Sequence, residues 1–373
     1  MKNLKKYCFI ALLLLCPFFK AVTIPFDFID GKIIVKVKIR DDQHNFIFDS
    51  GAFTIISSEL TGKLNEKKSS TVFEGIDANN VRSKMDVFST NNLQISDLNF
   101  ENINFSFADI GWMSSRACKK ISGILGANMM RNRIWRIDFK SRTITMSDKA
   151  EEEYSAASVM IPFSEENFTG VPKINAKIRN QDIRFIFDTG SGMGFTMNQK
   201  SYDAIKDKNF LAFEGLLSQS LNSISKGERR VDIMEVEINN SNLGNQLVDS
   251  SSDSPDLIGT RFIENYLVDL DFINKRIVLN RPNKSLEYLS FGISFAPVND
   301  NLIIVNKLQI PQLSGLNLTE KIIKINNMDT SKINNEIFCK VKLLLDNSQT
   351  ITLENASHEK FTLEKKDILR YLN

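Results

Sequence analysis

An aspartate motif occurs twice in the chain, each time after the same three apolar residues. The first copy reads Phe-Ile-Phe-Asp-Ser-Gly (46–51) and the second reads Phe-Ile-Phe-Asp-Thr-Gly (185–190). Each copy is an apolar run of strand type that ends in a carboxylate. A carboxylate at the end of a buried strand costs free energy unless it is paired or used. The repetition therefore predicts two related halves, one presenting Asp49 and the other Asp188.

Two further landmarks follow each aspartate in the same order. An apolar-apolar-Gly segment ends at Gly126 in the first half and at Gly259 in the second. Next, RIDFKSRTITM (136–146) matches DLDFINKRIVL (269–279). The stretches between the landmarks are rich in β-forming residues and are interrupted by polar turns. We therefore predict a mainly β chain with two related lobes. Their predicted ranges are 22–150 and 151–288.

The two aspartates have the pattern of an acid–base pair. Two carboxylates about 3 Å apart at the interface of related halves cannot both ionise, so they share a proton. The ionised carboxylate then takes a proton from a water that attacks an amide carbonyl, while the protonated one donates to the developing oxyanion. The residues predict hydrolysis of peptide bonds by a water held between Asp49 and Asp188.

The residues that follow each aspartate fit this chemistry. We expect the hydroxyls of Ser50 and Thr189 to form hydrogen bonds across the interface between the halves. We expect Gly51 and Gly190 to let the backbone approach the carboxylates without a Cβ clash.

One pair of following residues breaks the symmetry between the two motifs. Ser191 is expected to donate a hydrogen bond to Asp188, whereas its counterpart Ala52 has no hydroxyl to offer. The two carboxylates are therefore predicted to lie in different environments, which favours one of the two arrangements of the shared proton.

FIFDSGA and FIFDTGS resemble the active-site signatures of pepsin-like and retropepsin-like aspartic peptidases. The segments ILG and LIG (124–126 and 257–259) resemble those that pack beneath each catalytic loop in that family. The resemblance covers roughly residues 25 to 285. It implies two β-barrel-like lobes, a cleft between them and no cofactor. It also implies flaps, hairpins that cover the cleft, near 74–88 and 222–236.

The two predicted flaps are stretches with polar centres, FEGIDANNVRSKMDVF (73–88) and LNSISKGERRVDIMEVEI (221–238). Each is expected to fold as a hairpin with the polar residues at its tip. No tyrosine lies between Asp49 and Gly126, so the flap tyrosine of pepsins has no match in this chain.

The last part of the chain, 289–373, is predicted to be a small α+β domain. FGISFAPVNDNLIIVNKL (291–308) predicts two strands, and KVKLLL (340–345) with QTITLE (349–354) predicts a hairpin. The segment 314–329 resembles part of bacterial PDZ domains, although Thr319-Glu320 stands where Gly-Asp is usual. The resemblance implies that a peptide tail is bound as an added strand. The alternative is a domain that only buttresses the second lobe.

The N-terminus has the features of a secretory signal. Three lysines among the first six residues precede an apolar run over 7–19, which is too short for a comfortable membrane span. We expect a signal peptide over 1–21 and a location in the periplasm, in the cell envelope or outside the cell. Cys16 leaves lipid attachment of the chain to a membrane as an alternative.

The remaining composition excludes several classes of function. The net charge is +2 without a basic stripe, which gives no reason to expect nucleic-acid binding. No HExxH motif or Cys/His spacing predicts a metal site. Cys118 and Cys339 are far apart in sequence and are expected to be separate buried thiols rather than a disulfide. The sequence predicts an aspartic endopeptidase, with an inactive peptide-binding envelope protein of the same fold as the alternative.

Overall fold

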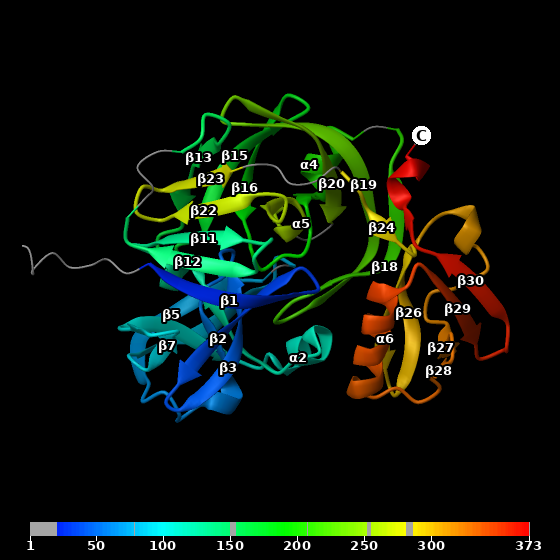
Figure 1. Cartoon of the computed structure of the whole chain (residues 1–373), viewed down its shortest axis with the longest axis horizontal. Helices are drawn as coiled ribbons and strands as arrows, with labels where there is room; N and C mark the ends of the chain where they lie inside the picture. The colour runs from blue at the N-terminus through cyan, green and yellow to red at the C-terminus, as the bar shows by residue number, and fades with distance from the viewer. Residues whose placement is uncertain are drawn as a thin grey trace, which may run out of the picture.

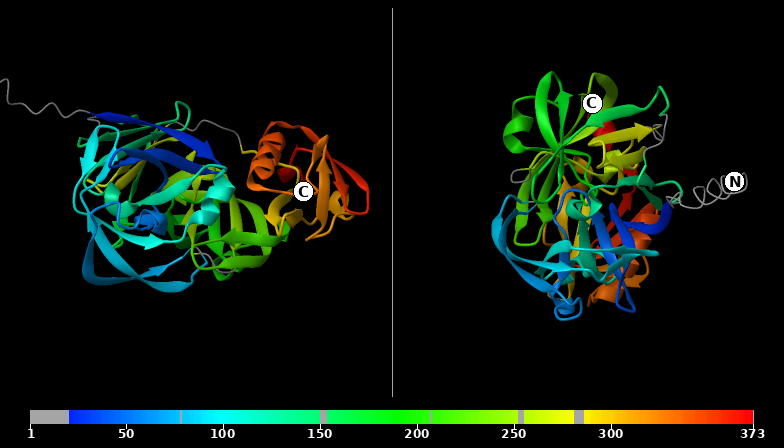
Figure 2. Two further views of the ribbon diagram at one scale, coloured as in Figure 1. Left: turned by 90° about the horizontal axis from the view of Figure 1, so that it is seen from below. Right: turned by 90° about the vertical axis from the view of Figure 1, so that its left-hand side faces the viewer.

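The structure is a computed structural model. Two lobes and a C-terminal domain lie beside one another (Figure 1; Figure 2). The described residues are 21–77, 79–149, 154–206, 208–251, 255–280 and 286–372. The predicted signal peptide, except for its last residue, and Cys16 lie outside these ranges. Within them, no helix has the length and apolar character that crossing a membrane requires.

The first lobe is built on a curved sheet in the order β1-β2-β3-β10-β4-β9-β6-β5. Strand β1 begins with alternating buried and exposed side chains, whereas the central strands β4 and β10 are buried at every residue within a core rich in phenylalanine and isoleucine. A short hairpin, β7–β8, pairs with β2. The strands of this lobe are β1 (Val22–Ile29), β2 (Lys32–Ile39), β3 (Asp42–Asp49), β4 (Ile55–Ser57), β5 (Lys67–Ile76), β6 (Arg82–Thr90), β7 (Leu93–Ile95), β8 (Leu98–Phe100), β9 (Ile103–Ala108) and β10 (Ile121–Gly126).

The second lobe repeats this arrangement in the order β15-β16-β21-β17-β20-β19-β18, with β14 paired to β15. The aspartate strand pairs in parallel with the glycine landmark strand in both lobes, β3 with β10 and β16 with β21. The prediction of a mainly β fold with two related lobes is therefore confirmed. The strands are β14 (Ser164–Glu165), β15 (Pro172–Ile178), β16 (Gln181–Phe187), β17 (Phe195–Asn198), β18 (Leu211–Gln219), β19 (Ile224–Ile238), β20 (Ser241–Ser251) and β21 (Leu257–Ile258).

The third landmark of the repeat joins the lobes. Strand β11 of the first half pairs antiparallel with β22 of the second, which places Arg136 opposite Asp269. The Arg136 guanidinium binds the buried Asp269 carboxylate through two hydrogen bonds of 2.7 Å. The strand order β13-β23-β22-β11-β12-β1 is symmetric about this pair. The strands not yet given bounds are β11 (Ile134–Asp138), β12 (Thr143–Ser147), β13 (Val159–Pro162), β22 (Leu267–Asp271) and β23 (Arg276–Asn280).

Short helices complete the lobes, and two of them occupy equivalent positions. Helices α3 and α5 both begin directly after the glycine that ends the landmark segment. Helix α2 lies between β9 and β10 in the first lobe. The helices of the lobes are η1 (Ser58–Leu60), α2 (Gly111–Ala117), α3 (Ala127–Met130), α4 (Gln199–Asp203) and α5 (Thr260–Ile263).

Only one of the two flap hairpins lies where the sequence predicted it. Strand β5 ends at Ile76 and β6 begins at Arg82, so this hairpin lies where it was expected. In the second lobe the turn falls at 220–223, between β18 and β19, so 222–236 is almost entirely one strand rather than a hairpin. The polar residues 226–228 are exposed within β19, which is paired with β18 on one side and β20 on the other. The polar character of 226–228 reflects the exposure of this part of β19 to solvent, not a turn.

The C-terminal domain combines a sheet with one longer helix, α6. Its strand β26 pairs with β18, so its sheet continues that of the second lobe. The remaining elements are β24 (Leu289–Ser290), β25 (Ile293–Val298), β26 (Asn301–Leu308), η2 (Pro311–Leu313), β27 (Lys321–Ile325), β28 (Met328–Asp329), α6 (Asn335–Asn347), β29 (Thr350–Asn355), β30 (Lys360–Glu364), β31 (Lys366–Asp367) and η3 (Ile368–Tyr371).

The predicted hairpin of KVKLLL with QTITLE is wrong, because KVKLLL lies within α6. The Asn334 side chain caps this helix by accepting a hydrogen bond of 2.8 Å from the Ile337 amide. Phe338 and Val341, three residues apart, bury one face of the helix. QTITLE contributes to β29, whose hairpin partner is β30. The cap and the helical spacing outweigh the apolar run that suggested a strand.

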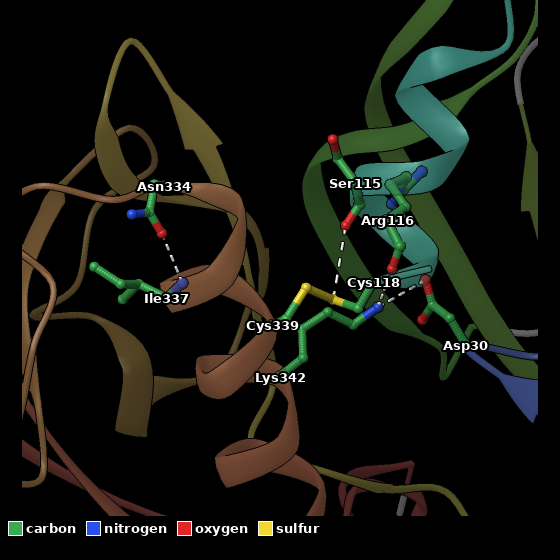
Figure 3. Close-up of a disulfide and its surroundings, with 8 residues drawn as sticks. All are labelled: Asp30, Ser115, Arg116, Cys118, Asn334, Ile337, Cys339 and Lys342. Carbon is green, nitrogen blue, oxygen red and sulfur yellow. Dashed lines mark hydrogen bonds and ion pairs between the residues drawn. A yellow bond between two sulfur atoms is a disulfide. The ribbon is translucent and has the colours of Figure 1, made fainter. Parts of the chain in front are cut away.

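The expectation that Cys118 and Cys339 are separate thiols is also wrong, since they form a disulfide (Figure 3). Cys118 ends α2 in the first lobe, and Cys339 lies on α6. Beside the disulfide, Lys342 of α6 donates a hydrogen bond of 2.6 Å to the Arg116 carbonyl and pairs with Asp30 at 3.3 Å. The C-terminal domain is therefore attached to both lobes, covalently to the first and by strand pairing to the second.

Candidate active site

The two motif aspartates lie at the ends of equivalent strands. Asp49 ends β3, opposite Gly126 in the parallel register of β10. Asp188 directly follows β16, and its amide donates a hydrogen bond of 2.9 Å to the Ile258 carbonyl on β21. The chain after each aspartate turns back over the landmark segment, forming two aspartate loops, 49–52 and 188–191. Because the strands are buried and paired on both sides, they fix the point at which each carboxyl emerges.

The two loops are locked together by a crossed set of hydrogen bonds. The Ser50 hydroxyl donates to the Phe187 carbonyl (2.6 Å), and the Thr189 hydroxyl donates to the Phe48 carbonyl (2.9 Å). Each hydroxyl also accepts from the opposite amide, Ser50 from Thr189 at 3.1 Å and Thr189 from Ser50 at 2.9 Å. Both side chains are fully buried. The four bonds form a symmetric joint between the lobes directly beneath the carboxyl groups.

Two glycines bring each loop against the carboxyl group of the other lobe. A Cβ atom placed on Gly51 would lie 2.5 Å from the Asp188 carboxyl carbon, and one on Gly190 would overlap the Asp49 carboxyl. The Gly51 and Gly190 amides also donate to the aspartates of their own loops, each at 2.8 Å. The structure therefore brings Asp49, Asp188 and these two glycines into one site.

The two carboxyl groups differ in their surroundings. Withdrawal from water, the charge of Asp188 and a hydrogen bond with the Asp188 side chain raise the pKa of Asp49 well above its usual range. Asp49 accepts one amide hydrogen bond, from Gly51 at 2.8 Å, whereas Asp188 accepts two, from Gly190 at 2.8 Å and from Ser191 at 3.0 Å. Amide donors favour a charged carboxylate. The raised pKa of Asp49 makes it the member of the pair that holds the shared proton.

Ser191 contributes to this difference through its backbone. The sequence predicted that its hydroxyl donates to Asp188, but the donor is the Ser191 amide. The hydroxyl accepts a hydrogen bond of 3.3 Å from the Met193 amide instead. The Ser191 hydroxyl, which Ala52 lacks, therefore stabilises the second aspartate loop and does not contact the Asp188 carboxylate.

A lysine in the site was missed by the sequence reasoning. Lys32, the first residue of β2, donates from its ammonium group to the Gly190 carbonyl. Its charge interacts with both Asp188 and Asp49. The signal available in the sequence was a charged residue at the start of an apolar strand, KIIV, that forms a hairpin with the aspartate strand.

The two flap hairpins meet at their tips. The Asp77 carboxylate of the first hairpin accepts from the hydroxyls of Ser220 (2.5 Å) and Ser223 (3.0 Å) on the second. The Asn79 amide group donates to the Ser223 hydroxyl at 3.0 Å and accepts from Ser218. We call these contacts the tip clasp. Asn79 is 6% exposed, so the clasp is a packed contact rather than a chance approach of two loops.

Aromatic packing supports the base of the first hairpin, where the chain lacks the flap tyrosine. Phe73 of β5 packs on Phe53, just after the first aspartate loop, and on Phe168, with 5.0 Å between ring centroids in both cases. Leu221, at the turn of the second hairpin, also packs against the cluster that contains Phe53. Both hairpins therefore pack against the cluster that contains Phe53, beside the first aspartate loop.

The chain was compared with family models, with curated protein sequences and with solved structures. A family model described as Aspartyl protease matches residues 35–129, which include Asp49 and Gly126. A crystal structure of an aspartic proteinase from Irpex lacteus is similar with a TM-score of 0.44 and 12% sequence identity, covering 70% of this chain and 98% of that chain. No curated protein sequence matches the chain significantly. The family match lies in the first lobe, and the equal strand order of the second lobe extends the same topology across the site.

Proposed function

We propose that the protein is an aspartic endopeptidase and that Asp49 and Asp188 are its catalytic pair. The observation that carries this proposal is the crossed joint of Ser50 and Thr189, which holds two carboxyl groups face to face across equivalent loops. The joint pairs six buried polar groups of the two loops through four hydrogen bonds, so the lobe interface holds both loops in the place where the carboxyl groups meet.

The geometry supports a mechanism without a covalent intermediate. A water held between the carboxyl groups gives a proton to ionised Asp188 as its oxygen attacks the amide carbon of the substrate. Protonated Asp49 donates to the carbonyl oxygen, which becomes the hydroxyl of a tetrahedral intermediate. Asp188 then passes its proton to the amide nitrogen, Asp49 regains its own, and the C–N bond breaks. Because the two groups exchange roles, the pair must start with one proton.

The test is a pair of isosteric substitutions at the two carboxyl groups. We expect Asp49→Asn and Asp188→Asn each to lower kcat/KM by about 10² to 10⁴-fold, because each removes one proton-transfer partner. Activity is read by mass spectrometry on a peptide library between pH 3 and 8. Asp182→Asn, at an exposed position on β16, is the matched control and retains activity. Full activity in either site variant overturns the proposal.

A second outcome of the same experiment favours the alternative function. If the wild-type protein binds peptides from the library but cleaves none across this pH range, the fold serves as a peptide-binding protein without turnover. Binding is measured on the same samples by recovery of the bound peptides.

The C-terminal domain is proposed to be PDZ-like and to bind a peptide tail. Strand β25 pairs with β26 and, among the described strands, with no other, so one of its edges is open to an added strand. We expect Asp188→Asn protein, used to prevent cleavage, to bind members of a C-terminal peptide library by fluorescence polarisation. Ser294→Pro, at an exposed position on β25, should weaken this binding, since proline removes a strand hydrogen bond. Unchanged binding in this variant would favour a buttressing domain.

Export of the protein is likewise proposed, from the basic start and the apolar run over 7–19. Mass spectrometry of the mature N-terminus from the native host distinguishes cleavage near Ala21 from acylation at Cys16. A mature protein that retains Met1 would contradict both.

A further inference from the structure

Lys32 links the first lobe to the aspartate loop of the second. Its ammonium group donates to the Gly190 carbonyl, and the Gly190 amide donates to Asp188 at 2.8 Å. The turn before Lys32 is fixed in the same place, because the Thr260 hydroxyl donates to the Gly31 carbonyl at 2.6 Å. A cation from one half is therefore linked to a carboxylate of the other through a single residue, Gly190, which hydrogen-bonds both groups.

The charges around Lys32 come from four elements of the fold. Asp188 and Asp49 face it from the two aspartate loops, Asp30 from the turn before β2, and Arg116 from α2. Asp30 is also paired with Lys342 of α6, at 3.3 Å. Burial lowers the pKa of Lys32, while the charges of Asp188, Asp30 and Asp49 act in the opposite direction. The two carboxyl groups of the site are thus principal electrostatic partners of this ammonium group.

The equivalent position of the second lobe has no charge. Ile34 of β2 pairs with Ile47, two residues before Asp49, and Lys173 of β15 pairs with Ile186, two residues before Asp188. Ile34 and Lys173 therefore occupy equivalent positions. Lys32 lies two residues before Ile34, and Val171 lies two residues before Lys173, so Lys32 and Val171 are equivalent as well. Val171 is a buried apolar residue. The lysine is therefore not a requirement of the repeated fold, which builds the same hairpin with valine.

We propose that Lys32 is a positioning residue that holds the Asp188 loop through Gly190 and sets the pH range in which the aspartate pair carries one negative charge. A nearby positive charge favours ionised carboxylates, so it moves both protonation steps of the pair to lower pH. The kinetic side of this inference rests on the proposed peptidase function. The pH range in which the protein is active should therefore extend to lower pH than it would for the same aspartate pair without this lysine.

The test compares three substitutions in the full-length protein. Lys32→Met removes the charge and keeps the length of the apolar stem, whereas Lys32→Arg keeps the charge. We expect Lys32→Met to move both limbs of the pH profile of kcat/KM upward by about 1 pH unit. Lys32→Arg should restore the wild-type limbs. Lys36→Met, at an exposed position on the same strand, is the control and leaves the profile unchanged.

A purely structural role for Lys32 gives a different result. In that case Lys32→Met lowers the melting temperature and kcat while both limbs stay in place, and this outcome overturns the inference. The inference also fails if Lys32→Arg shows the same shifted limbs as Lys32→Met.

A second measurement separates this inference from the proposed function. The carboxyl groups of ¹³C-labelled aspartate are titrated by NMR, with Asp49→Asn and Asp188→Asn identifying the pair. If wild-type protein shows no turnover but Lys32→Met shifts the carboxyl titration upward, the peptidase proposal fails and the role of Lys32 stands. Turnover together with an unchanged carboxyl titration in Lys32→Met rejects the role of Lys32 alone.

Discussion

The two lobes have one strand order but do not present the same residues to the site. Lys32 of the first lobe corresponds to Val171 of the second, and Ala52 corresponds to Ser191. A third pair of equivalent positions directly follows the landmark glycines, where the first lobe has Ala127 and the second has Thr260. Only Thr260 has a hydroxyl, which donates a hydrogen bond to the Gly31 carbonyl. The shared residues build the joint and place the carboxyl groups. The differing residues cluster around the loop of Asp188.

This contrast shows how a symmetric scaffold can give two identical side chains different tasks. The shared residues, which are Ser50, Thr189 and the two loop glycines, make equivalent contacts in the two lobes. They therefore bring the carboxyl groups together but do not distinguish one from the other. One difference between the two carboxyl groups comes from a residue without an equivalent partner, Ser191, whose amide donates a second backbone hydrogen bond to Asp188. Substitutions at shared positions should therefore have equal effects in the two lobes, and substitutions at differing positions should not.

Among the substitutions that test this contrast between the lobes, the largest expected effect comes from the loop glycines, which belong to the shared part. Gly51→Ala and Gly190→Ala each push a methyl group into the carboxyl group of the opposite lobe. We expect both to lower kcat/KM by about 100-fold, the loss typical of a displacement near 1 Å in an active site. Gly111→Ala, at the exposed start of α2, is the control. A large loss in only one of the two variants would show that the lobes are unequal even at the joint.

The next effect concerns the two attachments of the C-terminal domain, one covalent and one by strand pairing. We expect the double variant Cys118→Ser/Cys339→Ser to lose about 2 to 5 kcal/mol in the free energy of unfolding, because the disulfide closes a long loop. Denaturant unfolding under non-reducing conditions measures the change. Reductant should shift wild-type protein by the same amount and leave the double variant unmoved. Equal unfolding midpoints for the wild-type protein and the double variant without reductant would contradict this expectation. They would mean that the pairing of β18 with β26 is enough to hold the C-terminal domain in place.

The smallest effect concerns the tip clasp, where the first lobe supplies the carboxylate and the second supplies the hydroxyls. Partial burial opposes ionisation of Asp77, but hydrogen bonds from Ser220, the Val81 amide and Ser223 lower its pKa. The clasp is therefore fully formed above the usual carboxyl value of about 3.9 and is lost as the pH falls through the lower folded value.

Asp77→Asn should loosen the clasp at neutral pH by about 1 kcal/mol, a modest figure because the carboxylate is partly exposed. Hydrogen exchange should then be roughly fivefold faster in both hairpins, β5–β6 and β18–β19. Lys84→Met, at an exposed position on β6, is the control. Faster exchange in the first hairpin alone would show that the tips do not support each other.

The fold and the aspartate pair were predictable from the sequence for one physical reason. Strand ends, turn glycines and buried apolar triplets are local signals, and this chain repeats them in order. The repeat located Asp49, Asp188 and the Ser50–Thr189 joint, which depends only on the two halves meeting about an axis. The bilobal fold followed from the same landmarks.

The features that the sequence did not reveal depend on contacts across the fold. Lys32 has the appearance of a solvated strand lysine until β2 is placed against the loop of Asp188. Cys118 and Cys339 pair only because α2 and α6 lie side by side, 221 residues apart in sequence. KVKLLL is apolar enough for a strand, and only its cap at Asn334 and its buried face identify the helix.

The disulfide has a consequence for how cleavage of this chain would be detected. The loop it closes, from Cys118 to Cys339, contains the whole second lobe with Asp188 and the hairpin β18–β19. A single backbone cut anywhere inside that loop leaves two fragments joined through sulfur. Self-processing within that loop would therefore be invisible on a non-reducing gel, and the nicked molecule would keep its mass, apart from one added water, until a reductant separated the pieces.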